Sequence, residues 1–170
     1  GGGATVEYLV SVYYQNGVTI ANCNISGTGS GTANIYGIYG GTANNANANI
    51  YGNTVSITQS TATTGYIYGI YNAGLGTSGT TNTLNMYNNT IQNCTEPNST
   101  TSYFYGLYNV ATAFTINFYG NSVSNNVFGG SYYMYLCYTT SATGGTCNVY
   151  NNTVSNNQRS GAGTQSGSAY

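Results

Sequence analysis

Short apolar strings, separated by polar stretches, return along this chain at nearly constant intervals. One string, termed the corner motif, reads Asn-Ile-Tyr-Gly-Asn-Thr-Val-Ser at 49–56. Similar strings occur at 85–92, 117–124 and 148–155, and a weaker one occurs at 19–26. With Cys23, Asn53, Asn89, Asn121 and Asn152 aligned, the steps between successive copies are 30, 36, 32 and 31 residues. A repeat of this length predicts a stack of similar units, each of which buries its apolar side against its neighbours.

A second string, termed the tyrosine motif, alternates with the first and reads Ile-Tyr-Gly-Ile-Tyr-Gly at 35–40. It returns at 67–72 and 104–109, and in altered form at 9–14 and 134–139. Apolar positions recur every two or three residues, without the period of a helix. Strings rich in Ile, Val, Tyr and Thr between Gly and Asn are typical of strands. Each unit is therefore predicted to hold two strand-like strings, joined by polar connections such as 27–32, 58–64 and 74–83.

Two or three short strands per 30–36 residues favour one turn of a β-solenoid. A leucine-rich repeat would also need a helix, and a propeller blade would need four strands. The low hydrophobicity does not indicate disorder, because disordered chains are usually charged and poor in aromatic residues. This chain is 14% aromatic and only 2% charged. We therefore expect residues 1–170 to form a single all-β domain, a parallel β-solenoid of about five turns.

The corner motif predicts both core positions and a column of asparagines. Ile50 and Val55 are expected to point inward, with Asn53 at a corner between them. Stacking then aligns four corner residues, Asn53, Asn89, Asn121 and Asn152, whose amides can bond along the stack and satisfy backbone groups of the turns. This structural role explains the asparagines better than a ligand site does. The predicted core is Val12, Ile20, Ile25, Ile35, Ile50, Val55, Ile70, Met86, Ile91, Leu107, Phe118, Val123, Val149 and Val154.

Tyrosines are expected to form columns of their own. The columns are Tyr51/Tyr87/Tyr119/Tyr150, Tyr36/Tyr68/Tyr105/Tyr135 and Tyr39/Tyr71/Tyr108/Tyr138. Strict alternation cannot bury both Ile67 and Ile70 without an irregularity at Gly69, so one of Tyr68 and Tyr71 is expected to be partly buried. Outward rings suit protein contacts or sugar stacking, but they can equally serve only to support strand pairing. The sequence leaves both roles open.

The Ile-x-x-Asn-x-Val corner and the Tyr-Gly-Ile-Tyr strand resemble the right-handed parallel β-helix repeat family. This family is seen in pectate-lyase-like proteins and in many secreted and cell-surface proteins. The resemblance extends over about residues 9–170. It implies a right-handed parallel β-helix and a location outside the cell or on its surface. It does not imply one function, because the fold carries lyases, hydrolases, adhesins and scaffolds.

Charge is almost absent, which excludes several classes of function. The charged residues are Glu7, Glu96 and Arg159, and there is no His and no Lys. One Arg cannot neutralise a row of phosphates, so nucleic acid is not an expected partner. Enzymes of the resembled family use acidic clusters, whereas Glu7 falls in the first unit and Glu96 is expected in a loop of the third. Ser and Cys lack a His to activate them. We expect no catalytic site, no cofactor and no metal.

The sequence also excludes a membrane helix and suggests two kinds of covalent modification. No stretch approaches the ~18 apolar residues that a membrane-spanning helix needs. Cys137 and Cys147 flank a Gly/Thr/Ser-rich turn and are a candidate disulfide in an oxidising compartment. Cys23 and Cys94 lie two units apart, so we expect free thiols there. Candidate glycosylation acceptors are Asn24, Asn88, Asn93, Asn98 and Asn151, with Asn98 favoured because it follows Pro97 in a loop.

The expected function is structural. A net charge near zero removes the repulsion that keeps proteins apart, and Tyr170 falls inside a tyrosine motif. We expect either that the chain continues in a longer protein or that copies stack head to tail through uncapped ends. The predicted role is a non-catalytic, extracellular subunit or segment of a filament, sheath or adhesin stalk, with self-association into a homopolymer.

The sequence leaves two alternatives to the structural function. The first is a carbohydrate-binding surface, in which the tyrosine columns and neighbouring hydroxyl and amide groups bind polysaccharide. The second is an ice-binding solenoid, which needs a flat and regular array of threonines. Thr54, Thr90 and Thr153 align, but Asn24 and Ser122 interrupt this array. Ice binding is therefore the more remote alternative.

Overall fold

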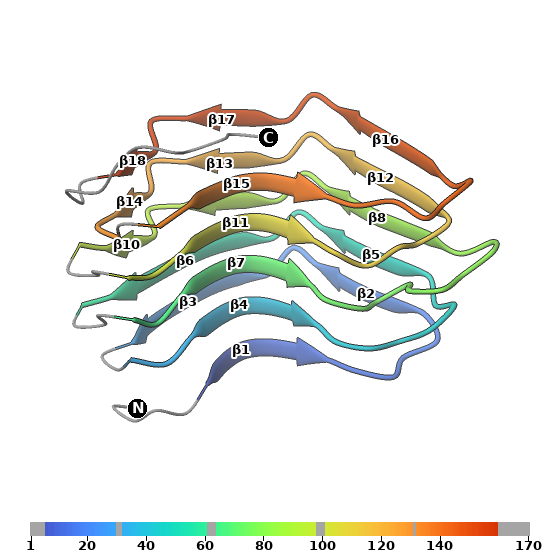
Figure 1. Cartoon of the computed structure of the whole chain (residues 1–170), viewed down its shortest axis with the longest axis horizontal. Coiled ribbons are helices and arrows are strands. Elements are labelled where there is room, and N and C mark those ends of the chain that lie inside the picture. Colours follow the sequence, from blue (N-terminus) through green and yellow to red (C-terminus); the bar gives the residue numbers. More distant parts are fainter. Residues whose placement is uncertain (1–5, 30–31, 61–63, 98–100, 131, 160–170) are drawn as a thin grey trace.

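The computed structural model describes residues 6–29, 32–60, 64–97, 101–130 and 132–159, which form an all-β solenoid of about five turns. Figure 1 shows the turns stacked on one another, and every strand pairing is parallel. The described residues contain no helix. The fold predicted from the repeats is confirmed.

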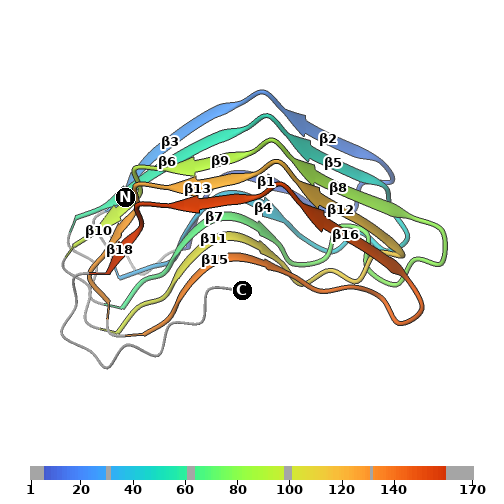
Figure 2. The same ribbon diagram turned by 90° about the horizontal axis from the view of Figure 1, so that it is seen from above.

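Three sheets run along the stack, and each turn contributes to all of them. Sheet 1 contains β1 (Glu7–Val12), β4 (Ile35–Gly40), β7 (Ile67–Asn72), β11 (Phe104–Asn109) and β15 (Met134–Thr139). Sheet 2 contains β2 (Val18–Ala21), β5 (Ala48–Tyr51), β8 (Thr83–Tyr87), β12 (Thr115–Tyr119) and β16 (Thr146–Tyr150). Figure 2 shows sheet 2 meeting sheet 3 at an angle, with sheet 1 facing them across the core.

Sheet 3 changes along the stack. Its first two turns give the single strands β3 (Asn24–Gly29) and β6 (Thr54–Gln59). In the later turns a second corner divides the strand, which gives β9 (Thr90–Gln92) and β10 (Thr95–Glu96), β13 (Ser122–Ser124) and β14 (Val127–Phe128), and β17 (Thr153–Ser155) and β18 (Gln158–Arg159). Strands β3 and β6 extend into two of the predicted connections, at 27–32 and 58–64.

The corner motif forms two strands, one on each side of a corner. The residue before each corner asparagine has a left-handed backbone, for example Gly52 with φ of 63° and Asn88 with φ of 54°. Gly and Asn adopt this conformation more readily than other residues. This explains why Gly and Asn alternate at that position of the motif. The turn then continues with Thr54 or Thr90 at the start of a strand.

Sheet 1 buries both apolar residues of the tyrosine motif, although of Ile67 and Ile70 only Ile70 was predicted in the core. Ile67 and Ile70 are completely buried, and Tyr68 is only 8% exposed. Tyr71 is half-buried. The strands stay in register on both sides of Gly69. The interrupted in-and-out alternation at this glycine is therefore shared by the neighbouring strands of sheet 1. The prediction that one tyrosine of the pair is partly buried is therefore confirmed.

The core agrees with the prediction except in the fifth turn. Val149 and Val154 continue the columns of Phe118 and Val123, but they are 55% and 45% exposed, because no further described turn covers them. Val12 is partly buried against the core. Core residues that the sequence did not predict include Ile38, Ile57, Ile67, Leu75, Leu84, Phe104, Ile116 and Phe128. The expectation of a loop at Glu96 was wrong, since Glu96 lies in β10 and is completely buried.

Candidate functional site

The predicted corner asparagines form a continuous hydrogen-bonded ladder. The Nδ2 of Asn53 donates to Oδ1 of Asn89 at 3.0 Å, Asn89 donates to Asn121 at 3.0 Å, and Asn121 donates to Asn152 at 2.9 Å. Each Nδ2 also donates to a carbonyl oxygen of the turn below, as Asn89 does to Ile50 at 2.8 Å. Each Oδ1 also accepts a backbone N–H, as that of Asn89 does from Asn53 at 3.2 Å.

The ladder uses the full bonding capacity of a central asparagine. Asn89 is completely buried, and its amide has two donor hydrogens and two acceptor sites. All four are engaged by Asn53, Asn121 and Ile50. No capacity remains for a ligand, which supports the structural role predicted for this column.

A second corner ladder lies in sheet 3 and was not predicted. The Nδ2 of Asn126 donates to Oδ1 of Asn157 at 2.7 Å, and the backbone N–H of Cys94 donates to Oδ1 of Asn126 at 2.9 Å. Here too the preceding residues are left-handed, with φ of 57° at Asn125 and 53° at Asn156. The paired asparagines at 125–126 and 156–157 are the sequence signal that could have revealed it.

A cysteine occupies the first position of each ladder. The backbone N–H of Cys23 donates to Oδ1 of Asn53 at 3.0 Å, and the Sγ of Cys94 accepts the backbone N–H of Ile57 at 3.4 Å. All four cysteines are free thiols, with Cys147 exposed. Burial raises the pKa of Cys94 to about 12 and that of Cys137 to about 11. The Cys137–Cys147 disulfide stays a prediction.

Thiol alkylation is expected to distinguish these cysteines. In the folded protein at neutral pH, iodoacetamide should modify the exposed Cys147 first and leave Cys94 unmodified. The thiolate is the nucleophile, and the raised pKa keeps Cys94 protonated as well as inaccessible. Mass spectrometry of peptides from timed samples measures both rates. In denaturant all four should react alike, and folded-state reaction of Cys94 as fast as that of Cys147 would contradict its place in the ladder.

Four of the candidate glycosylation acceptors lie on the surface. Asn24, Asn88, Asn93 and Asn151 are exposed, and Asn98 lies outside the described residues. Asn88, Asn93 and Asn151 are the left-handed residues before a corner, with φ between 54° and 55°. The ladder residue and a strand-starting threonine follow each of them. The corner motif alone thus explains why these three glycosylation sequences occur.

The tyrosine columns predicted from the sequence are also present. Rings along Tyr51, Tyr87, Tyr119 and Tyr150 have centroid separations of 4.8, 5.0 and 4.8 Å and interplanar angles of 6°, 8° and 1°. In sheet 1, the rings along Tyr36, Tyr68, Tyr105 and Tyr135 are separated by 4.4, 4.5 and 5.1 Å. The column of Tyr39, Tyr71, Tyr108 and Tyr138 is less regular, with angles of 74°, 51° and 22°.

Stacking decides which parts of these rings a partner can reach. In the two regular columns the rings between the ends have a neighbouring ring on both faces, so the columns present mainly ring edges and hydroxyl groups. Sugar stacking requires an open ring face. Burial, followed by the effect of neighbouring tyrosines, raises the pKa of Tyr39 to about 12 and also raises those of Tyr68 and Tyr105. These phenols therefore stay neutral at physiological pH.

The charged residues that a catalytic site would need lie apart in the fold. Glu7 lies in β1 and Glu96 in β10, on different sheets and in different turns. Arg159 lies in β18, where its Nε donates to the carbonyl oxygen of Gly130 at 2.9 Å. Among the described residues, no group of three or more His, Cys, Asp or Glu side chains is placed to hold a metal ion. No helix in the described part of the chain has the length and apolarity to cross a membrane.

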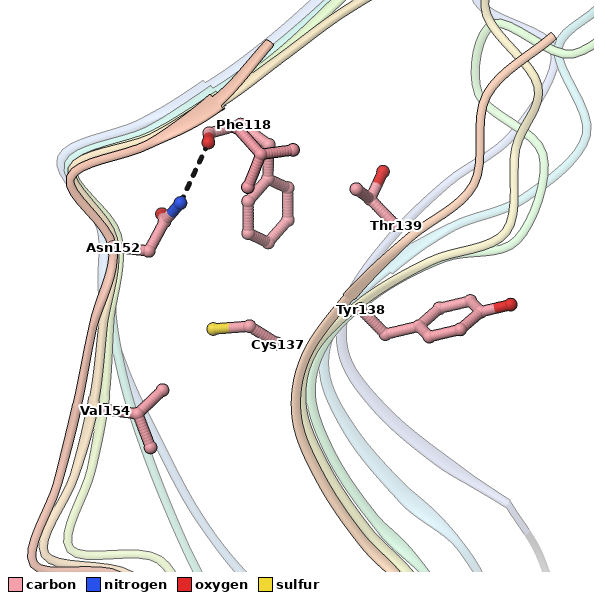
Figure 3. Close-up of a pocket in the computed structure, with 7 residues that line it drawn as sticks. Phe118, Cys137, Tyr138, Thr139, Asn152 and Val154 are labelled. Atoms are coloured by element: carbon pink, nitrogen blue, oxygen red, sulfur yellow. Dashed lines mark hydrogen bonds between the residues drawn. The ribbon is translucent and has the colours of Figure 1, made fainter. Parts of the chain in front are cut away.

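Within the described residues, the fifth turn leaves part of the core uncovered. A hollow of about 450 Å³ is lined by Phe118, Cys137, Tyr138, Thr139, Val149, Asn152 and Val154. Figure 3 shows Phe118, Cys137 and Val154 pointing into the hollow, while Tyr138 points away from it. Asn152 donates from Nδ2 to the carbonyl oxygen of Phe118 at 2.9 Å. In the part of the chain that the structure describes, the hollow is an end-on cross-section of the core, with an apolar floor and strand edges around it.

Comparisons with protein-family models, with curated proteins and with solved structures give no match for this chain.

Proposed function

We propose that this chain is a non-catalytic structural protein located outside the cell, a subunit or segment of a filament, sheath or adhesin stalk. The observation that carries the proposal is the open fifth turn, where Val149 and Val154 expose core positions. Within the described residues, no strand pairs with the outer edges of β15, β16 and β17. An apolar cross-section with free strand edges favours pairing with further solenoid turns.

The chemistry of the two ends supports stacking of one copy on another. The column that ends at Val149 begins at Ile20, and the column that ends at Val154 begins at Ile25. A second copy placed on the fifth turn would therefore continue each column with an apolar residue. The net charge of −1 opposes such association only weakly.

The proposal includes two further points, a right-handed parallel β-helix of the pectate-lyase-like kind and a location on or outside the cell. The repeated corner and tyrosine motifs support the first. The exposed acceptors Asn24, Asn88, Asn93 and Asn151 are compatible with the second. The stacked ring faces give the polysaccharide-binding alternative no specific support, and the threonine column that ice binding needs is interrupted by Asn24 and Ser122.

Electron microscopy of the native protein tests the proposal, together with a matched pair of variants. The wild type is expected to form fibres. Val154→Lys places a charge on the core cross-section and should reduce fibre formation at least tenfold, because an unpaired buried charge is costly. Thr153→Lys, on the same strand but exposed on the outer side, should leave fibres intact. Discrete particles for the wild type, or equal effects of both variants, would overturn stacking through the fifth turn.

A further inference from the structure

One tyrosine column is both regular and accessible. Tyr51, Tyr87 and Tyr119 are half-buried on the outer side of sheet 2, and Tyr150 is 49% exposed. Neighbouring rings are within 8° of parallel, with centroids no more than 5.0 Å apart. The parallel register of β5, β8, β12 and β16 fixes which tyrosines are neighbours.

We propose that the column Tyr51–Tyr87–Tyr119–Tyr150 is a site of oxidative modification, at which a haem peroxidase with hydrogen peroxide joins neighbouring tyrosines into dityrosine. Each phenol loses one electron and one proton and becomes a phenoxyl radical. Two radicals couple through ring carbons adjacent to the oxygens, which forms one carbon–carbon bond. The hydrogens on the coupled carbons move to the oxygens and restore both phenols. Hydrogen peroxide takes up the two electrons and two protons and becomes two water molecules.

Proximity favours coupling within the column over coupling between chains. Each ring has a neighbour held at about 5 Å by the strand register, so the second radical is present at a high effective concentration. Coupling of stacked rings requires a rotation that brings their edges together. The solvent side of this column leaves space for that rotation, most of all at Tyr150.

The tyrosines of sheet 1 provide an internal contrast. Tyr36 and Tyr68 are both only 8% exposed, and rings from two columns pack around them. An oxidant has less access to these phenols, and the rings have less room to turn. Links are therefore expected in sheet 2 before sheet 1.

Each link would join two successive turns of the solenoid. The pairs are Tyr51–Tyr87, Tyr87–Tyr119 and Tyr119–Tyr150, so links reach from the second turn to the fifth. The first turn has Ala21 at the equivalent position and would stay unlinked. This modification does not depend on the proposed structural function, because it takes place within one chain.

The test treats the purified protein with peroxidase and hydrogen peroxide, and follows dityrosine fluorescence, denaturing electrophoresis and mass spectrometry of linked peptides. The expected product migrates as a single chain, and linked peptides from all three neighbouring pairs of the column appear across the population, with at most two links in one molecule because each tyrosine couples once. Tyr87→Phe keeps the ring stack but should leave only the Tyr119–Tyr150 link. Tyr71→Phe, a matched change in sheet 1, should leave all three. Links found mainly between chains or mainly among sheet 1 tyrosines, an absence of links, or an unchanged pattern in Tyr87→Phe would each overturn the proposal.

Discussion

Replacing Asn89 with alanine is expected to lower the free energy of unfolding by about 2–6 kcal/mol, because it removes the acceptor of two donor groups of the buried Asn53, at about 1–3 kcal/mol each. These groups are the backbone N–H and the Nδ2 of Asn53, which donate to Oδ1 of Asn89 at 3.2 and 3.0 Å. The ladder is also cut between Asn53 and Asn121. Urea unfolding followed by circular dichroism measures the loss.

Asn85→Ala is the matched control for this prediction. Asn85 lies on the neighbouring strand β8, and its amide bonds only the amides of Asn49 and Asn117, at 2.8 and 2.7 Å, on the outer side of sheet 2. Its removal leaves no buried backbone group unpaired, so a loss of about 0.5 kcal/mol is expected, as for other surface changes. Equal losses for the two variants would show that the inner ladder has no special role.

Gly69→Ala is expected to destabilise the solenoid by about 1–3 kcal/mol or more, the usual cost of overpacking a core. A Cβ at Gly69 would lie 2.6 Å from the carbonyl oxygen of Gly106 and 2.7 Å from Cγ2 of Ile91. The first obstacle is backbone of the next turn, so relief requires sheet 1 to open locally. Thermal unfolding monitored by circular dichroism gives the size of the effect.

Gly29→Ala separates this steric effect from the general effect of replacing a glycine. Gly29 ends β3, and a Cβ there would have its nearest neighbour, Cγ of Gln59, at 3.6 Å, which is ordinary contact. We expect this variant to be neutral or slightly stabilising, because alanine restricts the unfolded chain more than glycine does. If Gly29→Ala lowered the melting temperature as much as Gly69→Ala does, the close contacts of Gly69 with Gly106 and Ile91 could not be the cause of the destabilisation.

The features that were best predicted from the sequence are those that recur in every turn of the solenoid. Because the strands pair in register, one corner asparagine per unit was enough to place Asn53 and Asn89 in one column and Ile50 and Val55 in the core. The alternation of inward and outward side chains along a strand could not be used for prediction where strands are very short. Strand β10 has two residues, Thr95 and Glu96, which is too few to show a period. A charged residue there was therefore expected in a loop, although the second corner turns it inward.

Exposure at the end of the stack was the other feature that the pattern did not show. Val149 belongs to the same column as Phe118 and has the same apolar character. Whether such a residue is buried depends on what lies above it, and the pattern within one repeat contains no such information. The second ladder was missed for a different reason. It begins only at Cys94, in the third turn, so Asn126 and Asn157 had too few equivalents to stand out as a column.

The ladder has a direction, and this has a consequence for how a stacked assembly would break. Each amide donates to the Oδ1 of the following turn, so the backbone N–H of Asn152 and its second amide hydrogen point towards whatever lies above. In a stack of copies that position is taken by Cys23, whose sulfur is a much weaker acceptor than an amide oxygen. The joint between copies is then the weakest step along the fibre. Agitation should shorten such fibres to whole multiples of one chain, with fragment lengths spaced by a single subunit.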